Sequence, residues 1–400
     1  MNNKDFINDM HARGFINQCS DFDGLQAALE SGPITAYLGF DPTADSLHQG
    51  HLIPIMLLRW LQKYGNNVIM LVGGATGRIG DPSGRDTGRP MMTEEILAKN
   101  VAGLKKSCAK VCDMKRVAVV DNHDWMKKYS HMDFLAEFGT AFTVPHMLSM
   151  ESVRRRLETG MTFLEFNYMT FQAVDFLHLY KDRGCALQLC GADQWGNSIM
   201  GIDLIRKKIG GSAFVLSTSI ITDSAGNKVG KSAGNAVWLN EDKTSPYDYF
   251  QYFRNTPDDL VEKFLKLFTE FSLPEIAEIM RGDINEAKRR LAFAATEIVH
   301  GTDAAETAAD AAAALFGCGD ISNAPTAVYK IAATLPSVLD FCMAVGLFAS
   351  KSEARRTIDQ GGLTLNEERV ANPDQVVLLQ PGVSVLLKKG KKTFLRVAVE

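Results

Sequence analysis

The sequence predicts an α/β fold: a Rossmann-like doubly wound parallel sheet, followed by an all-α domain and a small α+β domain. Short apolar runs typical of buried strands alternate with helical patterns, and they lie at 34–40, 68–72, 117–120, 186–190 and 214–216. Beyond residue 256 the apolar spacing is helical, and near the C-terminus alternating runs return at 363–365, 376–379, 383–387 and 394–399. A doubly wound sheet binds ligands at the carboxyl ends of its strands, so these positions are where a site is expected.

The remaining elements are predicted to be helices. Residues up to about 31 have helical apolar spacing, and the segment from 47 to 64 is apolar nearly all round, which indicates a buried helix. Residues 134–180 are also helical in pattern. Thr256-Pro257 is a strong helix start, because it combines a cap with a proline in the first turn. Helices are expected at 286–300, at 304–315, and from 350 to a stop at Gly361-Gly362.

Composition excludes several classes of protein. The net charge of −4 argues against a nucleic-acid coat, although residues 351–400 hold nine Lys or Arg against six Asp or Glu, so basic charge gathers at the tail. Seven cysteines without a C-x-x-C pair indicate reduced thiols and a cytoplasmic location, and argue against a zinc site. No apolar run approaches the ~20 residues that span a bilayer, and the N-terminus has no signal-peptide pattern.

The stretch from Tyr37 to His51 has the features of a nucleotide phosphate site. A strand breaks at Asp41-Pro42, and a helix is predicted to start just after Asp45-Ser46, either of which can cap it. His48 and His51 then share one face of the first turn, where free N–H groups favour an anion, and Gly50 admits a ligand close to the backbone. Taken alone, two histidines three apart are more often a surface pair. The pattern lacks the spacing of four and the Glu that are usual for zinc, so no metal site is predicted.

A second stretch, Lys228-Val229-Gly230-Lys231-Ser232, gives the histidines a context. H-Q-G-H resembles the H-I-G-H signature of class I aminoacyl-tRNA synthetases, and K-V-G-K-S resembles their K-M-S-K-S signature. The stretches at 37–51, 72–85 (V-G-G-A-T-G-R-I-G-D-P-S-G-R) and 191–197 (G-A-D-Q-W-G-N) resemble bacterial-type tyrosyl-tRNA synthetases. The resemblance extends from about residue 10 to the C-terminus.

The resemblance implies a tyrosine–tRNA ligase, which joins L-tyrosine to ATP, releases pyrophosphate, and transfers tyrosine from the adenylate to the terminal adenosine of tRNA(Tyr). A carboxylate is already ionised at pH 7, so catalysis needs alignment of the reactants and stabilisation of phosphate charge, not a general base. The catalytic residues implied are Thr43, His48, His51, Arg85, Arg89, Lys228, Lys231 and Ser232. Mg²⁺ is expected to enter on the ATP phosphates, because it tends to keep its waters.

The resemblance also assigns the substrate contacts. Tyr37 and Asp175 would read the phenol hydroxyl of tyrosine, and steps of four and three place Tyr168, Gln172 and Asp175 on one helix face. The full tyrosine set is Tyr37, Asp81, Tyr168, Gln172, Asp175 and Gln194. The ATP set is Gly39, Asp41, His48, Gly50, His51, Gly191, Asp193 and Lys231. Against the family pattern, Leu38 replaces a frequent Cys, Arg85 a frequent Lys, and Val229-Gly230 the usual Met-Ser.

The predicted domains follow the same resemblance. Residues 1–225 form the catalytic domain with a helical insertion that makes a homodimer, and 226–320 the lysine-signature loop and the α-helical anticodon-side domain. Residues 321–336 form a linker, and 337–400 an RNA-binding domain similar to one first named for a ribosomal protein. Basic residues expected to contact tRNA phosphates, where a solvated surface is the plain alternative, are Arg154, Arg155, Arg156, Arg355, Arg356, Lys388 and Lys389.

Three other readings stay open from the sequence. A tryptophanyl-tRNA synthetase shares the fold, but the Tyr37 and Asp175 pair and the C-terminal domain disfavour it. A catalytically silent RNA-binding relative is disfavoured by two intact signatures. A general nucleotidyl transferase of the superfamily would lack the tail domain.

Overall fold

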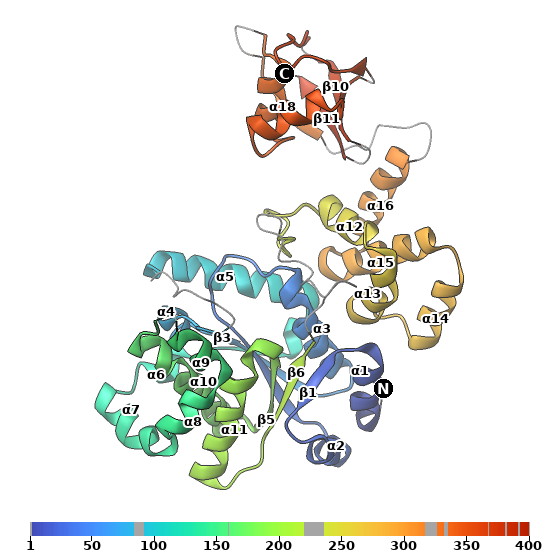
Figure 1. The fold of residues 1–400 in the computed structure, drawn as a ribbon. Coiled ribbons are helices and arrows are strands. Elements are labelled where there is room, and N and C mark those ends of the chain that lie inside the picture. The colour runs from blue at the N-terminus through green and yellow to red at the C-terminus, as the bar shows by residue number, and fades with distance from the viewer. Residues whose placement is uncertain are drawn as a thin grey trace. The chain divides into compact units, whose positions relative to one another are not determined.

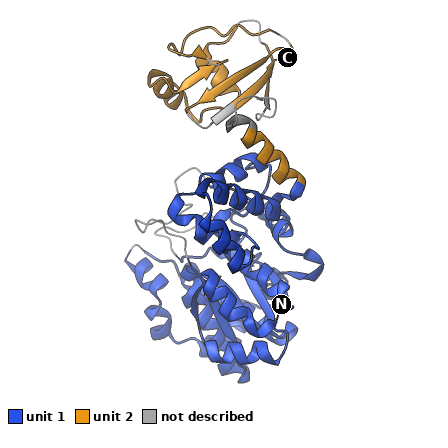
Figure 2. Ribbon diagram, turned by 90° about the vertical axis from the view of Figure 1, so that its right-hand side faces the viewer, with its two compact units in different colours: residues 1–302 blue, residues 303–400 orange. Residues whose placement is uncertain are grey.

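The computed structural model describes residues 2–83, 92–158, 160–219, 236–316, 326–331, 335–366, 368–380, 382–390 and 393–399. The chain divides into two compact units, residues 1–302 and residues 303–400 (Figure 2). The mixed α/β architecture agrees with the predicted fold class.

The centre of unit 1 is a sheet with the strand order β1-β6-β5-β2-β3-β4 (Figure 1). Its strands are β1 (Ile16–Cys19), β2 (Thr35–Phe40), β3 (Asn67–Val72), β4 (Val117–Asp121), β5 (Cys185–Gly191) and β6 (Phe214–Thr218). All neighbours are parallel except β1, which runs antiparallel to β6. From β2 the chain moves outward to β3 and β4, then crosses to β5 on the other side. The order therefore reverses between β2 and β5, which is where such sheets bind ligands.

Helices cover both faces of this sheet (Figure 1). One face carries α3 (Gln49–Lys63), with α5 (Glu94–Val111) beside it, and the other carries α10 (Phe163–Arg183) and α11 (Trp195–Ile209). As its apolar sequence predicts, α3 is almost wholly buried, including Trp60 at 1% exposure. The shorter helices are α1 (Phe6–Arg13), α2 (Phe22–Ser31), α4 (Thr76–Ile79), α6 (His123–Met126), α7 (His131–Phe138), α8 (Val144–Ser149) and α9 (Glu151–Leu157).

Unit 1 also contains a helical part with an aromatic core. Its helices are α12 (Pro246–Arg254), α13 (Val261–Phe268), α14 (Leu273–Arg281) and α15 (Ile284–His300). Phe253 packs edge-on against Phe264 and Phe268. The predicted helix start at Thr256-Pro257 is followed first by a 3₁₀ turn, Asp258–Leu260, and then by α13. Arg59 and Lys63 of α3 both pair with Glu270, which ties this part to the sheet domain.

Unit 2 is a small α+β fold around one apolar core. Its sheet has the strand order β7-β11-β10-β8-β9. The core of the unit includes Phe341, Leu387 and Val397, which are fully buried. The elements are α17 (Val338–Ala344), α18 (Lys351–Asp359), β7 (Thr326–Tyr329), β8 (Leu363–Leu365), β9 (Glu368–Arg369), β10 (Ser384–Lys389) and β11 (Thr393–Val399), with α16 (Thr302–Phe316) before them.

Three elements differ from the expectation. Residues 16–19 form the edge strand β1 within a segment predicted to be helical. The run has no apolar pattern of its own, so its conformation is set by pairing with β6, which lies about 200 residues away in the sequence. Strand β7 lies within the predicted linker 321–336 and pairs in parallel with β11. Residues 376–379 are not a strand: Val376 makes one isolated bridge, to Ser337, and Leu378 is 82% exposed.

Arg156, expected to contact tRNA phosphate, is instead an internal residue. It is 3% exposed, and its guanidinium donates to the Glu165 carboxylate at 2.7 Å. Glu165 also accepts from the Thr162 backbone and hydroxyl, which completes a capping box at the start of α10. The arginine therefore neutralises a buried cap, whereas its neighbours Arg154 and Arg155 are exposed.

We predict that Arg156→Ala lowers the free energy of unfolding by about 3–5 kcal/mol, because the buried Glu165 carboxylate loses its counter-ion. Urea unfolding followed by circular dichroism measures the change. Arg155→Ala is the matched control, and a surface change of this kind stays within about 0.5 kcal/mol. Equal effects of the two substitutions would contradict the assignment.

Candidate active site

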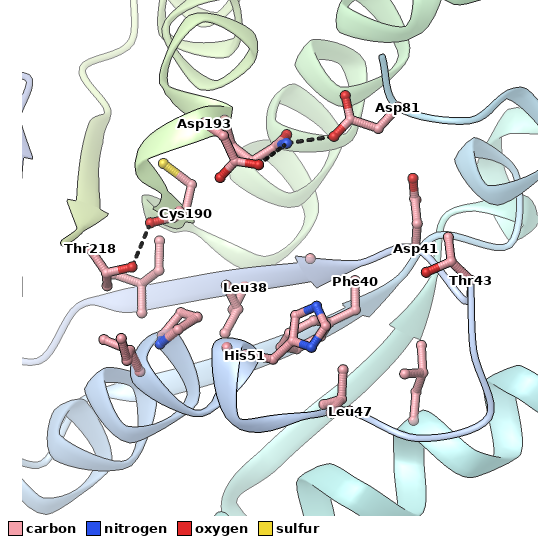
Figure 3. Close-up of a pocket in the computed structure, with 18 of the residues that line it drawn as sticks. Leu38, Phe40, Asp41, Thr43, Leu47, His51, Asp81, Cys190, Asp193 and Thr218 are labelled. Carbon is pink, nitrogen blue, oxygen red and sulfur yellow. Dashed lines mark hydrogen bonds between the residues drawn. The ribbon is translucent and has the colours of Figure 1, made fainter. Parts of the chain in front are cut away.

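A cavity of about 720 Å³ opens at the carboxyl ends of β2 and β5, where the strand order reverses (Figure 3). It is bounded by the ends of these strands, the start of α3 and one face of α10. The structure brings into its wall the predicted residues Tyr37, Gly39, Asp41, Thr43, His48, Gly50, His51, Asp81, Tyr168, Gln172, Asp175, Gly191, Asp193 and Gln194. Arg85, Arg89, Lys228, Lys231 and Ser232 lie outside the described residues.

The two histidines cap α3 themselves, in place of the predicted caps Asp45 and Ser46. The His48 Nδ1 accepts from the Gly50 backbone N–H at 3.0 Å, and the His51 Nδ1 accepts from the His48 N–H at 3.4 Å. The two rings lie 4.1 Å apart between centroids. A Cβ on Gly50 would come within 2.8 Å of the His48 ring, so glycine is needed for this cap.

This cap decides which ring nitrogens can donate. A neutral imidazole whose Nδ1 accepts a hydrogen bond carries its proton on Nε2. His48 and His51 thus each have an N–H donor at Nε2, close to the positive end of the α3 dipole. This end of the cavity is suited to an anionic ligand group.

Asp175 is the buried acceptor at the α10 wall of the cavity. It is 2% exposed and accepts from the Asn122 Nδ2 at 2.9 Å and the Trp125 Nε1 at 2.8 Å. Burial raises the pKa of Asp175 to about 8, although these two hydrogen bonds oppose the shift and nearby Asp41 adds to it. The carboxyl group retains acceptor capacity for a hydroxyl donor.

Tyr37 supplies a second group for a hydroxyl. Its own hydroxyl oxygen is buried and finds no hydrogen-bond partner among the described residues, and the same holds for the Gln188 Oε1 in the cavity wall. An unpaired buried hydroxyl costs about 1–3 kcal/mol, so it favours a ligand that restores the bond. Burial and the charge of Asp175 raise the pKa of Tyr37 well above its ordinary value, which keeps the hydroxyl a donor.

Asp41 is connected to Asp175 by a chain of hydrogen bonds. The Asp41 carboxylate accepts from the Thr76 hydroxyl at 2.7 Å, Asn122 donates to that hydroxyl at 3.0 Å, and Asn122 also donates to Asp175. The Tyr168 hydroxyl donates to the other Asp41 oxygen at 2.9 Å. This chain fixes the orientation of both carboxyl groups before any ligand binds.

Asp81 provides a third carboxyl group in the cavity. It is 7% exposed and accepts from the Gln194 side-chain amide and, at 2.9 Å, from the Ser83 backbone N–H (Figure 3). Burial, with a contribution from Asp41, raises the pKa of Asp81 to about 6. The carboxyl groups of Asp41, Asp81 and Asp175 face one cavity with an imidazole pair at its α3 end, which suits a ligand that carries both an ammonium group and an anionic group.

Sequence reasoning missed Thr76, Asn122 and Trp125, which support these carboxyl groups, and Gln188, whose unpaired Oε1 lies in the cavity wall. Asn122 directly follows β4 and Thr76 follows β3 by four residues, so the rule that sites gather at strand ends could have found both. Trp125 and Gln188 give no such signal, because an apolar turn and an apolar strand explain them equally well.

The cationic residues predicted to contact tRNA differ in how exposed they are. Arg355 and Arg356 are exposed on α18, whereas the Lys389 ammonium is bound within unit 2, to the Glu353 carboxylate at 2.7 Å and over the Phe348 ring at 4.4 Å. The Lys389 ammonium thus already has partners within unit 2, and the phosphate contact expected of it stays a prediction. In the described ranges, His, Cys, Asp and Glu side chains nowhere gather in threes as metal ligands, and the helices are too short or too polar to cross a bilayer.

Comparison with known proteins agrees with this geometry. Residues 29–317 match the family model described as tRNA synthetases class I (W and Y). The tyrosine–tRNA ligase of Xanthobacter autotrophicus is 46% identical over 97% of this chain and 96% of its own, and that of Clostridium tetani is 42% identical over 97% of each. A C-terminally truncated mitochondrial tyrosyl-tRNA synthetase of Aspergillus nidulans superposes with a TM-score of 0.69 at 32% identity, covering 76% of this chain and 92% of that chain.

With identity above 40% along almost the entire length of both relatives, the chain belongs to the tyrosine–tRNA ligase family of class I aminoacyl-tRNA synthetases.

Proposed function

We propose that this chain activates L-tyrosine with ATP, forming tyrosyl-adenylate and pyrophosphate, and then transfers tyrosine to the terminal adenosine of tRNA(Tyr). The observation that carries the proposal is the content of one cavity. It holds a buried pair that can read a phenol hydroxyl, Tyr37 and Asp175, together with the two imidazoles at the start of α3.

The cavity residues contact different parts of the substrates. Asp175 accepts from the substrate hydroxyl and Tyr37 donates to it, while Asp81 binds the substrate ammonium with Tyr168, Gln172 and Gln194 nearby. The ammonium favours the ionised form of Asp81, so it lowers the pKa that burial has raised. Asp41, Gly39, Gly191 and Asp193 then hold the nucleotide at the strand ends.

The chemical step needs no general base. The substrate carboxylate attacks the α-phosphorus directly, and charge develops on the phosphate oxygens as pyrophosphate leaves. We assign the Nε2 donors of His48 and His51, with Thr43 at the cavity edge, to those oxygens. By family resemblance Arg85, Arg89, Lys228, Lys231 and Ser232 supply the remaining cations and donors.

Magnesium and location complete the proposal. Mg²⁺ would neutralise phosphate charge while bound to the nucleotide, which fits a cavity whose carboxyl groups already accept protein hydrogen bonds.

We also propose a cytoplasmic location, since the described cysteines are free thiols and mostly buried. Finding the protein in a membrane or secreted fraction would contradict that location.

The direct test is exchange of labelled pyrophosphate into ATP with tyrosine, tryptophan or phenylalanine. We expect exchange with tyrosine and little with the other two, because only tyrosine brings a hydroxyl to Tyr37 and Asp175. Preferential exchange with tryptophan would favour the tryptophan branch of the family. Absence of exchange with all three would favour a catalytically silent RNA-binding protein.

Asp175→Asn should weaken selection of tyrosine over phenylalanine. An amide at this position faces the Asn122 and Trp125 donors with one acceptor instead of two, so the hydroxyl-reading geometry is lost. An unmade hydrogen bond of about 1–3 kcal/mol corresponds to roughly a ten- to hundredfold fall in the ratio of kcat/KM values. Tyrosyl-tRNA synthetases are themselves the standard example of such hydroxyl-dependent selection. An unchanged ratio in the exchange assay would show that Asp175 does not read the hydroxyl.

We propose a homodimer formed through the insertion between β4 and β5. Large apolar side chains are exposed there on neighbouring helices, and they are Met132, Leu135, Val144, Leu148, Leu157, Phe163 and Leu164. Exposed apolar surface of this kind marks an interaction site, and a second copy is the partner that the family resemblance supplies.

Phe163→Asp, which places a charge on a side chain that is 70% exposed, should give a monomer in sedimentation equilibrium. Phe22→Asp, at 42% exposure on α2, is the matched control and should leave the dimer intact. A monomeric unmodified protein would contradict the proposal.

For tRNA we propose phosphate contacts from Arg355, Arg356 and Lys388 of unit 2 and from Arg154 and Arg155 of the insertion. Replacing the first three by Ala should leave pyrophosphate exchange unchanged, weaken tRNA binding, and reduce the salt dependence of that binding by about two to three phosphate equivalents. Filter binding at several salt concentrations measures both effects. An equal effect from removing three cations of unit 1, at Lys4, Lys115 and Arg116, would refute a specific role.

A further inference from the structure

The segment that follows the lysine-signature stretch is attached to the histidine segment by backbone pairing. The Gln49 N–H donates to the Val237 carbonyl at 2.9 Å, and the Leu239 N–H donates to the Leu47 carbonyl at 2.8 Å. His48 and Trp238 form an antiparallel bridge between these bonds, and their rings meet edge to face at 5.7 Å. The Gln49 side chain adds a third bond, accepting from the Val237 N–H at 2.8 Å.

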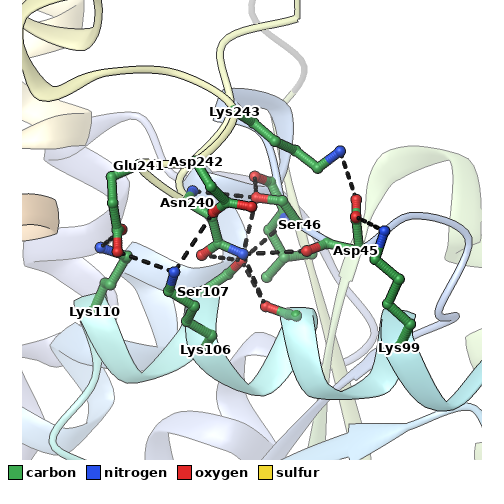
Figure 4. Close-up of polar contacts among 12 residues, drawn as sticks. Asp45, Ser46, Lys99, Lys106, Ser107, Lys110, Asn240, Glu241, Asp242 and Lys243 are labelled. Carbon is green, nitrogen blue, oxygen red and sulfur yellow. Dashed lines mark hydrogen bonds and ion pairs between the residues drawn. The ribbon is translucent and has the colours of Figure 1, made fainter.

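Three buried polar residues add hydrogen bonds between these segments and α5. We call Ser46, Ser107 and Asn240 the serine–asparagine node (Figure 4). All three are at most 2% exposed. The Ser107 Oγ accepts from the Leu47 N–H at 3.0 Å and lies 3.1 Å from the Asn240 Oδ1. The Asn240 N–H donates to the Ser46 Oγ at 3.2 Å, and its Nδ2 donates to the Asp45 and Gly103 carbonyls.

The loop before His48 also packs closely against the backbone of α5. A Cβ on Gly103 would lie 2.0 Å from the Asp45 carbonyl oxygen, so the backbone of the loop rests directly on this helix. A displacement of the loop in that direction is therefore blocked by the helix backbone.

Ion pairs surround the node on its exposed side. Asp45 pairs with Lys99 at 3.0 Å and Lys243 at 2.6 Å, and Glu241 pairs with Lys106 at 3.0 Å and Lys110 at 2.5 Å (Figure 4). Their lysine partners lower the pKa of Asp45 to about 2 and that of Glu241 to about 2. These exposed pairs add little by themselves, and the buried hydrogen bonds fix the geometry.

We propose that Ser107 and Asn240 are positioning residues for adenylate formation, which they assist by fixing the backbone that places His48 and His51. The inference rests on the proposed function. Within the described residues, the hydrogen bonds of the node do not reach Tyr37 or Asp175, whereas two of them hold Ser46 and Leu47, which directly precede His48. Loosening the node displaces the donors at the phosphate end of the cavity and leaves the hydroxyl end in place.

The test compares Ser107→Ala and Asn240→Ala with the unmodified enzyme in tyrosine-dependent pyrophosphate exchange. We expect kcat to fall about 10- to 100-fold, because misplacement of aligned groups by about an ångström costs that much. The Kd for tyrosine, measured by equilibrium dialysis without ATP, should change less than about twofold, since binding of that substrate is not altered. Ser107→Thr keeps the hydroxyl and should restore most of kcat.

Thr269→Ala is the matched control, because it removes another fully buried hydroxyl, bonded to the Leu265 carbonyl at 2.6 Å in the helical part of unit 1. It should lower the unfolding midpoint without changing kcat. If Ser107→Ala and Asn240→Ala lower kcat no more than Thr269→Ala does, or lower kcat and tyrosine binding in parallel, the positioning role is overturned. If the unmodified enzyme shows no exchange, the proposed function itself fails, so the two failures are distinct.

Discussion

The parallel pairing of β2 with β5 is the constraint on which the rest of the structure depends. The chain leaves these two strands toward opposite sides of the sheet, so no crossover helix fills the space above their carboxyl ends. Asp41 follows one strand and Asp193 follows the other, and the same edge receives α3 with its two histidines. Residues more than 130 positions apart in sequence therefore share one cavity because of strand order alone.

Three carboxyl groups of that cavity, of which Asp81 and Asp175 are buried, are held by protein hydrogen bonds. Asp175 is held by Asn122 and Trp125, Asp41 by Thr76 and Tyr168, and Asp81 by Ser83 and Gln194. The raised pKa values of Asp175 and Asp81 show that this compensation is incomplete. Incomplete compensation favours a ligand that brings a hydroxyl donor and an ammonium. The free-energy cost of burying these carboxyl groups thus becomes a preference for a ligand that pairs with them.

The sequence predicted the parts of this arrangement that local chemistry determines. The parallel strands and the buried α3 follow from apolar runs, whereas the cavity-lining residues were predicted from the family resemblance that the short signatures carry. What it missed depends on distant partners: β1 pairs with β6, β7 pairs with β11, and Arg156 is buried against Glu165. The same limit applies to His48, since a capping histidine is recognised only once the ring is seen over the Gly50 N–H.

Glycine and serine have a further role in this site, which is to set how closely backbones approach. Gly73 leaves room for the Asp41 and Thr76 pair, with a Cβ position only 2.2 Å from the Asp41 carboxylate, and Gly103 leaves room for the loop before His48. Ser107 then fills the remaining space with one hydroxyl that satisfies the Leu47 N–H. Small residues that carry no catalytic group thus determine where the histidines stand, because a buried N–H must be paired and a packed backbone cannot shift without strain.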